Sequence, residues 1–443
     1  MARLEGWVAA AGDILWGFPL VSVLMLTGLY FSVRLRMPQG RWIKDWLGGT
    51  LRRLWKKEEA GQTGEITPRQ ALCTALAGTM GTGNIIGVAT AVSLGGAGAV
   101  VWMWISAIFG MMTKYAETVL SVKFRKKNRE GNWVGGAMEY IAEGLKNPRL
   151  AGIFALFCVL ASFGMGNMAQ TNAISDALGE TFSWDTRWSA GGVVLVLIVV
   201  IFGGLKRIAR VSEGLIPVLS VVYLLGGMVV IAVHGGNLPE CLRRMGEEAF
   251  SLKSAAGGIG GSALAAALRY GVGRGVFSNE AGLGSSGMVY AAAEGAKPSE
   301  AGMWGIFELF LDTMVVCTVT ALAILTAGTV EIGAGAGMVS AAFGSVFGRV
   351  GEVFVAVSVV LFAFASMLGW EYYGERGFCT LSGQEDGRGY RAVFLAVAFL
   401  GGVARLELVW NLSEIFNGLM ALPNLYAIFR LRRVVLEEAG GKG

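Results

Sequence analysis

Long apolar segments separated by short polar loops make up most of this chain. A helix that crosses the roughly 30 Å hydrocarbon core of a bilayer needs about 20 predominantly apolar residues. Eleven segments meet this requirement and predict transmembrane helices at residues 14–33, 69–94, 98–122, 150–178, 189–205, 212–234, 257–291, 303–328, 350–373, 390–405 and 407–431. Amphipathic stretches at 133–147, 240–256 and 334–348 are typical of helices that lie on the membrane surface or in a vestibule. The pattern predicts an all-α polytopic membrane protein.

Positive charges fall in alternate loops, as the positive-inside rule requires of loops on the cytoplasmic side. One set of loops carries most of the Lys and Arg residues, at 34–57, 123–149, 206–210, 297, 376–391 and 430–433. The opposite set contains only Arg3, Arg187, Arg243, Arg244, Lys253, Arg349 and Arg405. This alternation predicts an odd number of crossings of the cell membrane, with the N-terminus outside and the C-terminus in the cytoplasm.

The composition excludes most other protein classes. Of the 443 residues, 54% are hydrophobic and 16% are charged, and the mean hydropathy is +0.57. A soluble chain carries about 25% charged residues, so this chain lacks the polar surface that a globule of its size would need. The 67 glycines follow no Gly-X-Y period, which excludes collagen, and the apolar content excludes disorder. The first apolar segment lacks a small-residue cleavage site, so we expect no removed signal peptide.

Residues that usually carry catalysis or hold metal ions are scarce. The five cysteines form no CxxC pair, and most lie in apolar segments, where cysteine acts as a small hydrophobic residue: Cys73, Cys158, Cys241, Cys317 and Cys379. The single histidine, His234, lies at the end of an apolar segment and suits a membrane interface. A membrane-embedded enzyme would need a nucleophile with a base, or a set of metal ligands. We therefore expect neither an enzyme nor an organic cofactor.

Two of the apolar segments are interrupted by glycine-rich polar sequences. The first interruption spans residues 78–87 (GTMGTGNIIG) and the second spans residues 269–282 (RYGVGRGVFSNEAG). Glycine lowers helix stability by about 1 kcal/mol relative to alanine, so clustered glycines weaken a helix locally. Backbone groups freed inside a membrane must face protein, water or a ligand; such helix ends attract carboxylates, and exposed carbonyls can hold a small cation. Glycines at these spacings also form helix-packing faces, which is the alternative explanation.

The positions of the interruptions predict an internal repeat. If the first helix is an extra element, the other ten divide into two sets of five, and each set begins with an interrupted helix. The charge pattern gives the two sets opposite orientations, as in the five-plus-five inverted repeats of secondary transporters. We predict an extra helix and a basic cytoplasmic loop at 1–67, repeats at 68–236 and 237–432, and a cytoplasmic tail at 433–443. Gly95, Gly96 and Gly98 follow the first interruption and are a candidate hinge.

Several ionisable residues lie within or near the predicted membrane helices. A charge at the centre of such a helix costs about 2.5–3.5 kcal/mol on insertion scales, so each group needs a partner. Arg274 and Glu280 belong to the second interruption and are candidate partners of each other. The sequence does not decide whether they bind the solute, gate the pathway or form a structural pair. Glu117 and Asp312 each lie beside a hydroxyl residue, and we interpret them as structural hydrogen-bonding groups outside the binding site.

Sequence strings between about residues 68 and 426 resemble the sodium:alanine/glycine symporter family. In chain order they are GTGNIIGVATAVSLGG, WMWISAIFGMMTKYAET, GNMAQTN, GGLKRIA, RGVFSNEAGLGS, LDTMVVCTVTAL, LGWEYYGE and NGLMALPNL. The combination of GTGNI with RGVFSNEAG is highly specific. The resemblance implies a fold of the leucine-transporter type, the five-plus-five inverted repeat, preceded by one extra helix. It also implies sodium-driven uptake of small neutral amino acids such as alanine and glycine by alternating access.

The resemblance implies roles for residues that match the family's motifs. Thr79, Gly83 and Asn84 match positions at the substrate or ion site, where exposed amides suit a carboxylate. Gln170 matches a glutamine that is expected near the bound amino acid. An amide side chain can hydrogen-bond to a carboxylate and to an ammonium group alike. Residues of the second interruption, two aromatic walls and a hydroxyl complete the implied site: Phe277, Ser278, Asn279, Phe163, Trp370 and Ser366. Packing is the alternative role for the aromatic residues.

The implied cation site is where this chain departs from the family. Such a site combines carbonyls of the first interrupted helix with two hydroxyls of the eighth core helix, and the family's Ser-Thr pair is Ala365-Ser366 here. Sodium, as a hard cation, prefers oxygen ligands, and we expect it near Gly78, Thr79, Asn84 and Ser366. The alternatives are a symporter coupled to protons or another cation, a symporter of another small neutral amino acid, and an ion channel.

The expected partners are therefore a small neutral amino acid, a sodium ion (Na+) as the coupling ion and the lipid bilayer, with no nucleic acid. The sequence shows no recognisable coiled coil or soluble assembly domain, which is compatible with a functional monomer. It does not distinguish glycine from alanine or a slightly larger solute.

Overall fold

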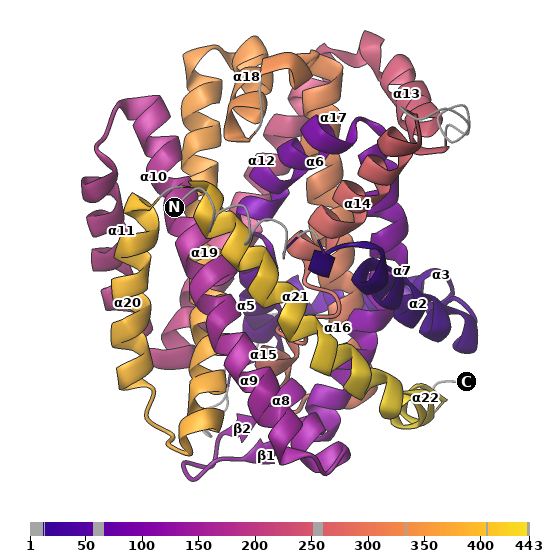
Figure 1. Cartoon of the computed structure of the whole chain (residues 1–443), viewed down its shortest axis with the longest axis vertical. Helices are drawn as coiled ribbons and strands as arrows, with labels where there is room; N and C mark the ends of the chain where they lie inside the picture. The colour runs from indigo at the N-terminus through magenta and orange to yellow at the C-terminus, as the bar shows by residue number, and fades with distance from the viewer. Residues whose placement is uncertain are drawn as a thin grey trace.

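The computed structural model describes residues 12, 14–55, 66–250, 260–332, 335–404 and 406–440. Nearly all of these residues are helical, and most of the long helices run along the long axis of the molecule (Figure 1). Several expectations lie partly outside the described residues. They concern the basic residues Arg3, Lys56, Lys57, Lys253 and Arg405, the first residues of the predicted helix at 257–291 and the end of the amphipathic stretch at 240–256.

Each of the eleven ranges predicted to cross the membrane contains a helix. These are α2 (Phe18–Arg34), α5 (Pro68–Thr79) with α6 (Ile86–Gly95), α7 (Gly98–Lys123), α9 (Pro148–Phe163) with α10 (Ala169–Phe182), α11 (Thr186–Ile201), α12 (Gly204–Val233), α14 (Gly260–Asn279) with α15 (Gly287–Ala291), α16 (Pro298–Leu309) with α17 (Thr318–Ala327), α19 (Arg349–Ser382), α20 (Arg388–Val403) and α21 (Leu406–Arg430). Within the described residues, five helical segments are long and apolar enough to span a membrane, or six if the bent pair α5–α6 is one span. The helical architecture is confirmed, and the count of eleven crossings stays a prediction.

The remaining elements are short. The helices are α3 (Pro38–Arg41), α4 (Thr50–Trp55), α8 (Ala137–Glu139), α13 (Leu238–Phe250), α18 (Ala336–Phe347) and α22 (Arg432–Gly440). Turns of π type form η1 (Lys44–Gly49), η3 (Tyr140–Gly144), η4 (Gly164–Met168) and η7 (Phe310–Cys317), and 3₁₀ turns form η2 (Thr82–Asn84), η5 (Gly235–Asn237) and η8 (Thr329–Ile332). The helices α13 and α18 coincide with two of the three predicted amphipathic stretches.

The third amphipathic stretch, at 133–147, begins as a hairpin, so the prediction of a helix is wrong for its first residues. Strand β2 (Trp133–Val134) pairs antiparallel with β1 (Lys126–Lys127), and only α8 and η3 beyond it are helical. The side chain of Asn128 closes the turn, because its Oδ1 accepts the N–H groups of Glu130 at 3.1 Å and Asn132 at 2.9 Å. The Arg125 guanidinium lies 4.4 Å from the centroid of the Trp133 ring and stabilises this strand further.

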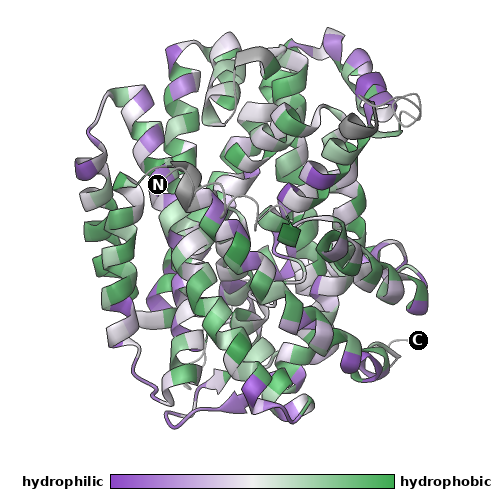
Figure 2. Cartoon of the chain, viewed as in Figure 1, coloured by the Kyte–Doolittle hydropathy of each residue, from purple (hydrophilic) through white to green (hydrophobic). Residues whose placement is uncertain are grey.

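Apolar side chains cover the outer faces of several helices. On α12 they include Val218, Val221, Val222, Leu225, Met228 and Val229, and comparable exposed residues lie on α11 and α20. Figure 2 shows that hydrophobic positions occupy the middle of these helices, whereas hydrophilic positions gather toward the ends of the molecule. Contiguous apolar surface of this kind is rare on soluble proteins and suits contact with lipid.

The helix α13 is attached to the junction between α6 and α7, where the sequence predicts a hinge. Glu248 Oε2 accepts the backbone N–H of Ala97 at 2.7 Å. Gly98 lies so close to α13 that a Cβ on it would be 2.6 Å from the backbone nitrogen of Ala249. Trp102 Nε1 also donates to the Ala249 carbonyl at 3.1 Å. The helix α13 is therefore held against this junction and the start of α7.

Candidate functional site

The first predicted interruption is a break in the helix. The helix α5 begins at a capping box, in which Thr67 and Gln70 each accept the other's backbone N–H, and it ends at Thr79. Gly81 is extended (φ −121°, ψ −147°), one 3₁₀ turn follows, and α6 leaves at an angle of 58° to α5. Residues 80–85 are all buried. The freed backbone is therefore enclosed by protein, as a break at membrane depth requires.

Two side chains from other helices hold the broken backbone. Gln170 on α10 accepts the Thr82 N–H through Oε1 at 3.2 Å, and its Nε2 donates to a carbonyl of η4 at 3.0 Å. Ser366 on α19 donates to the Gly78 carbonyl at 2.9 Å. A Cβ on Gly81 would lie 2.9 Å from the Ser366 side chain and 3.1 Å from Gln170 Oε1. Only glycine allows both side chains to approach the backbone this closely.

The second break lies at the end of the predicted interruption. The helix α14 is continuous to Asn279, so most of the predicted interruption at 269–282 is helical. Its glycines allow close packing on α7: a Cβ on Gly271 would collide with the Ala99 carbonyl, and one on Gly275 would lie 2.8 Å from Ser106 Oγ. The helix ends where Glu280 adopts a left-handed backbone (φ +57°), and regular structure resumes at α15. The packing explanation is therefore correct for Gly271 and Gly275.

Asp312 joins the two breaks. It lies on the π turn η7 between α16 and α17 and is fully buried. Its carboxylate accepts hydrogen bonds from Asn84 Nδ2 at 2.7 Å, from Ser278 Oγ at 3.0 Å and from Thr313 Oγ1 at 2.8 Å. A Cβ on Gly83 would be 3.2 Å from the Cα of Ser278, so the two broken segments touch. One carboxylate thus binds both breaks, on a type of turn that is frequent at functional sites.

Most of the predicted site residues lie around this junction. Six make the contacts just described: Gly78, Gly83, Asn84, Gln170, Ser278 and Ser366. Asn279 joins them, because its Nδ2 donates to Thr313 Oγ1 at 3.1 Å. The Thr79 hydroxyl turns back to its own helix instead, 3.3 Å from the carbonyl oxygen of Leu76. Thr79 therefore offers the junction its backbone rather than its hydroxyl.

The predicted aromatic residues divide into two groups. Trp370 is buried and donates from Nε1 to Glu280 Oε1 at 2.7 Å, which places it at the second break. Phe277 is also buried, and its ring centroid lies 5.4 Å from that of Trp410. Phe163 lies apart from the junction, stacked on Tyr390 with the centroids 5.4 Å apart and packed against a separate hydrophobic cluster. Its assignment as a wall of the site stays a prediction.

Two oxygen atoms at the first break have no hydrogen-bond partner among the described residues. They are Thr82 Oγ1 and Asn84 Oδ1, both buried, although buried polar atoms are nearly always paired. Ala365 is buried and adds no oxygen, while Ser366 Oγ is bonded to the Gly78 carbonyl. Clusters of three or more His, Cys, Asp or Glu suited to a metal ion are absent from the described part of the chain. A set of neutral oxygen donors suits a small hard cation such as sodium.

Two acidic residues that the sequence interpretation left outside the site help to form this region. Their hydrogen-bonding role is confirmed, but Asp312 contacts both breaks. Glu117 on α7 accepts the Asn424 amide at 2.6 Å and the backbone N–H of Gly284 at 3.0 Å, so it holds the segment that follows Glu280. The sequence offered one signal for the importance of these two residues: each carboxylate lies within an apolar segment.

Arg274 pairs with Glu414 rather than with Glu280, so that expected pairing is wrong. The Arg274 Nη2 and Glu414 Oε1 atoms are 2.8 Å apart. The guanidinium also lies 5.7 Å from the centroid of Phe277 and 5.8 Å from that of Trp410. Arg274, Phe277 and Glu414 line a cavity of about 210 Å³ between α14 and α21. The ion pair and the two rings therefore close the approach to the second break from this cavity.

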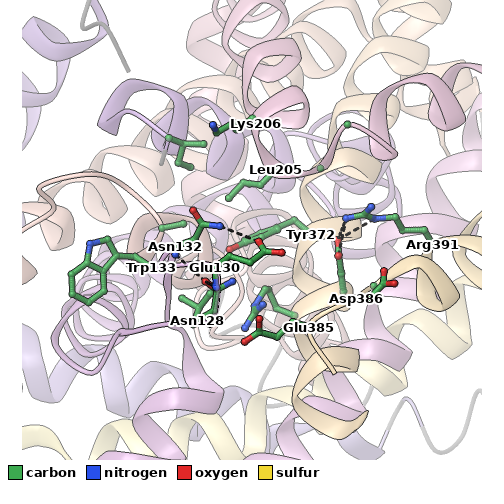
Figure 3. A pocket seen from close by; sticks show the side chains of 18 of the residues that line it. Asn128, Glu130, Asn132, Trp133, Leu205, Lys206, Tyr372, Glu385, Asp386 and Arg391 are labelled. Atoms are coloured by element: carbon green, nitrogen blue, oxygen red, sulfur yellow. Dashed lines mark hydrogen bonds and ion pairs between the residues drawn. The ribbon is translucent and has the colours of Figure 1, made fainter. Parts of the chain in front are cut away.

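A larger cavity of about 630 Å³ lies at the end of the molecule that carries β1 and β2 (Figure 1). Figure 3 shows polar side chains of the hairpin, such as Asn128 and Asn132, on one side of it and Arg391 on the other. Arg391 Nη2 is 2.8 Å from Glu375 Oε1, and Arg391 Nε is 3.4 Å from Glu371, the neighbour of Trp370. An ion-pair network at the wall of this cavity thus reaches the residue next to Trp370.

Comparisons with known proteins agree with this geometry. The model of the sodium:alanine symporter family matches residues 1–440. The sodium/alanine symporter AgcS of Methanococcus maripaludis is 38% identical over 440 residues, covering 97% of this chain and 95% of that protein. An uncharacterized transporter of Haemophilus influenzae is 41% identical over 98% of this chain and 95% of its own length. The probable sodium/glutamine symporter GlnT of Bacillus subtilis is 37% identical, covering 98% and 89%.

Solved structures share the fold at low sequence identity. MhsT in complex with L-phenylalanine aligns with a TM-score of 0.53 and 14% identity, covering 85% of this chain and all of that chain. A mutant of the Eremococcus coleocola manganese transporter aligns with a TM-score of 0.54 and 15% identity, covering 86% and 81%. The chain therefore has a leucine-transporter-like fold and is a multi-pass membrane protein. It belongs to the sodium:alanine symporter family, a family of transporters rather than enzymes.

Proposed function

We propose that this chain is a symporter that couples uptake of a small neutral amino acid, such as alanine or glycine, to sodium by alternating access. The observation that carries the proposal is the meeting of two helix breaks at one buried carboxylate, with unpaired oxygens beside it. Relatives named as sodium/alanine and sodium/glutamine symporters support this substrate class and Na+ as the coupling ion. The ligand of such a transporter binds where the broken helices meet.

The amino-acid zwitterion is proposed to bind between the two breaks. The start of α6 presents backbone amides near Gly83 and Asn84, and helix N-termini bind carboxylates. The ammonium would then face the hydroxyl and amide oxygens of Ser278 and Asn279. Gln170 already spans the first break and can serve either group. Phe277 and Trp370 would limit the size of the side chain, and Thr79 and Ser366 complete the proposed set.

Sodium is proposed to bind on the first break, near Gly78, Thr79, Asn84 and Ser366. Asn84 Oδ1 has no hydrogen-bond partner within the described part of the chain, and the Gly78 carbonyl and Ser366 hydroxyl could turn from each other to the ion. Thr82 Oγ1 would supply the oxygen that Ala365 lacks. Because the two ligands would share one junction, each is expected to raise the affinity of the other by the same factor.

The proposed mechanism also needs the predicted layout of the chain. An extra helix would precede inverted repeats at 68–236 and 237–432, with the N-terminus outside and the tail at 433–443 in the cytoplasm. The position of a break in the first helix of each set supports this division. The Arg274–Glu414 side would then face outward, and the large cavity beside Arg391 would open to the cytoplasm.

Uptake of labelled alanine into proteoliposomes tests the proposal. An inward sodium gradient is expected to drive alanine above its equilibrium concentration, and replacing sodium with potassium should abolish this accumulation. Unlabelled glycine should compete, whereas a bulky aromatic amino acid should not. Equal accumulation without sodium would contradict the proposed coupling, and a current that does not saturate with substrate would indicate a channel.

The outer ion pair gives a prediction for a matched set of variants. Arg274→Gln is expected to slow alanine uptake roughly tenfold, the effect of about 1.4 kcal/mol, because it leaves Glu414 without its partner. The double variant Arg274→Gln, Glu414→Gln should regain much of the rate, since neither charge is then unpaired. Arg243→Gln, on the exposed face of α13, is the control and should change uptake little. Equal rates for the single and double variants would show that the pair does not control access.

A further inference from the structure

A second group of buried charges lies beside the second break. Lys114 and Glu117 are neighbours on one face of α7, Glu280 begins the break, and Glu308 lies on α16. All four residues are at most 1% exposed. Three carboxylates thus share one interior region with a single ammonium. The proposed sodium ligands are not among these residues or their hydrogen-bond partners.

Glu280 has hydrogen-bond donors for both oxygens, whereas Glu308 has a donor for one oxygen and the Lys114 ammonium as an ion-pair partner beside the other. Glu308 Oε1 lies 3.3 Å from the Lys114 ammonium, and the Tyr290 hydroxyl donates to Glu308 Oε2 at 2.9 Å. Glu280 accepts Trp370 Nε1 at 2.7 Å through one oxygen and the Ser285 hydroxyl through the other. These contacts can stabilise an ionised carboxylate.

Glu117 is paired through one oxygen only. Its Oε1 accepts the Asn424 amide and the Gly284 N–H, whereas its Oε2 has no partner among the described residues. An ionised oxygen in that position would be buried without compensation, next to two other carboxylates and one ammonium. Like charges in one site oppose each other's ionisation, so a proton on one of them relieves the excess. The unpaired oxygen of Glu117 is the place where that proton fits.

Other titratable groups around the cluster do not remove the excess negative charge. Those that face it are Tyr140, Cys158, Tyr290, Asp312 and Tyr373. Tyrosine and cysteine side chains are neutral near pH 7 in their ordinary state, and Asp312 would add a further negative charge. Lys114 is the only basic residue among the four, and its Nζ already lies 3.3 Å from Glu308 Oε1.

We propose that these four residues form a proton-binding site in which Glu117 carries an exchangeable proton that moves with the amino acid. The proposal rests on the proposed symport function. None of the four residues lines either cavity described above. An O–H bond forms on Glu117 Oε2 while the second break is open to one solution. The same bond breaks, releasing the proton, when the break is open to the other solution. Glu117 also holds Gly284, so loading this site would change how firmly the second break is fixed.

Proton movement with alanine is the direct test. Proteoliposomes are loaded with a pH-sensitive dye, and labelled alanine is added under an inward sodium gradient at clamped membrane potential. The lumen is expected to acidify in proportion to alanine uptake. Across a series of external pH values, the uptake rate should fall roughly tenfold per pH unit above the midpoint, the slope of one titrating group. Alanine uptake without acidification would overturn the proposal.

Two substitutions assign the proton to this site. Glu117→Gln keeps the shape and the contact with Gly284 but cannot release a proton, so alanine exchange between equal pools should persist while proton movement and the pH slope disappear. Glu438→Gln is the control, because that carboxylate pairs with Lys123 at the exposed end of the same helix α7. An unchanged proton flux in Glu117→Gln would overturn the assignment.

Infrared spectroscopy separates failure of this site from failure of the proposed transport function. The purified protein in detergent should show the band of a protonated carboxyl group that decreases as the pH rises, and Glu117→Gln should lack it. If no amino acid is transported but this band is present, the symport function fails and the proton site stands. If transport occurs and the wild-type protein shows neither the band nor proton movement, the proton site fails alone.

Discussion

Asp312→Ala is expected to abolish sodium-driven alanine uptake, with the initial rate falling at least about 100-fold. The carboxylate hydrogen-bonds to both breaks, through Asn84 at 2.7 Å and Ser278 at 3.0 Å; the Cys317 sulfur also contacts both residues, at 3.4 and 3.6 Å, but is a weaker acceptor. Its removal takes the carboxylate acceptor from three buried donors, Asn84, Ser278 and Thr313, and an unsatisfied buried donor costs about 1–3 kcal/mol. The two segments would also lose their common anchor. Initial uptake rates over a range of alanine and sodium concentrations measure the effect.

Asp312→Asn serves as the conservative comparison. It keeps the size of the side chain and one carbonyl oxygen, so it should retain more transport than Asp312→Ala. Asp386→Asn is the control for loss of a carboxylate, because Asp386 is exposed and pairs with Arg388 on the surface. Thermal unfolding in detergent would separate loss of the fold from loss of the site. Near-normal uptake by a folded Asp312→Ala variant would rule out the proposed junction.

Gln170→Leu should raise the alanine concentration that gives half-maximal uptake by about 100-fold. The Gln170 amide accepts the Thr82 N–H and donates to η4, so leucine would leave a buried donor and a buried carbonyl unpaired. A site built to hydrogen-bond its substrate loses far more than the contact itself when its polar groups are left unpaired. Substrate-dependent thermal stabilisation should be lost in parallel with uptake.

The control for this variant is Gln384→Leu, since Gln384 is exposed in a loop far along the chain from either break. Gln170→Glu separates polarity from charge, because it keeps an acceptor for Thr82 but adds a negative charge near the zwitterion. If the acceptor for the Thr82 N–H matters more than the added negative charge, Gln170→Glu should bind alanine better than Gln170→Leu. Unchanged half-saturation in Gln170→Leu would remove this residue from the proposed site.

The helices and the first break could be predicted from the sequence because both follow from local composition. Each range predicted from apolar length contains a helix, and glycines with polar neighbours marked the bend at Gly81. The prediction placed the start of the second break too early, because glycine occurs both in helix breaks and on helix-packing faces. In α14, Gly271 and Gly275 are helical and allow contact with α7, and the chain unwinds only at Glu280. Sequence spacing alone does not separate a packing glycine from a glycine in a break.

Long-range partners explain most of the remaining differences. Asp312 reaches Asn84 across 228 positions, and Arg274 reaches Glu414 rather than the nearer Glu280. Phe163 matched a family position but packs on Tyr390, because the direction of a side chain depends on helix rotation. These pairings arise from how the helices pack, and a pattern within one segment carries no information about them.

The attachment of α13 to the hinge through Glu248 offers a means of controlling the carrier. The opposite face of α13 is exposed, where Arg243 pairs with Glu240 at 2.6 Å and with Glu247 at 2.6 Å. An antibody fragment that bound this charged face would immobilise α13 and, through it, restrain the junction between α6 and α7 and the start of α7. Such a reagent would be a non-competitive inhibitor: it would arrest the cycle without occupying the amino-acid path, and it would trap a single conformation for structure determination.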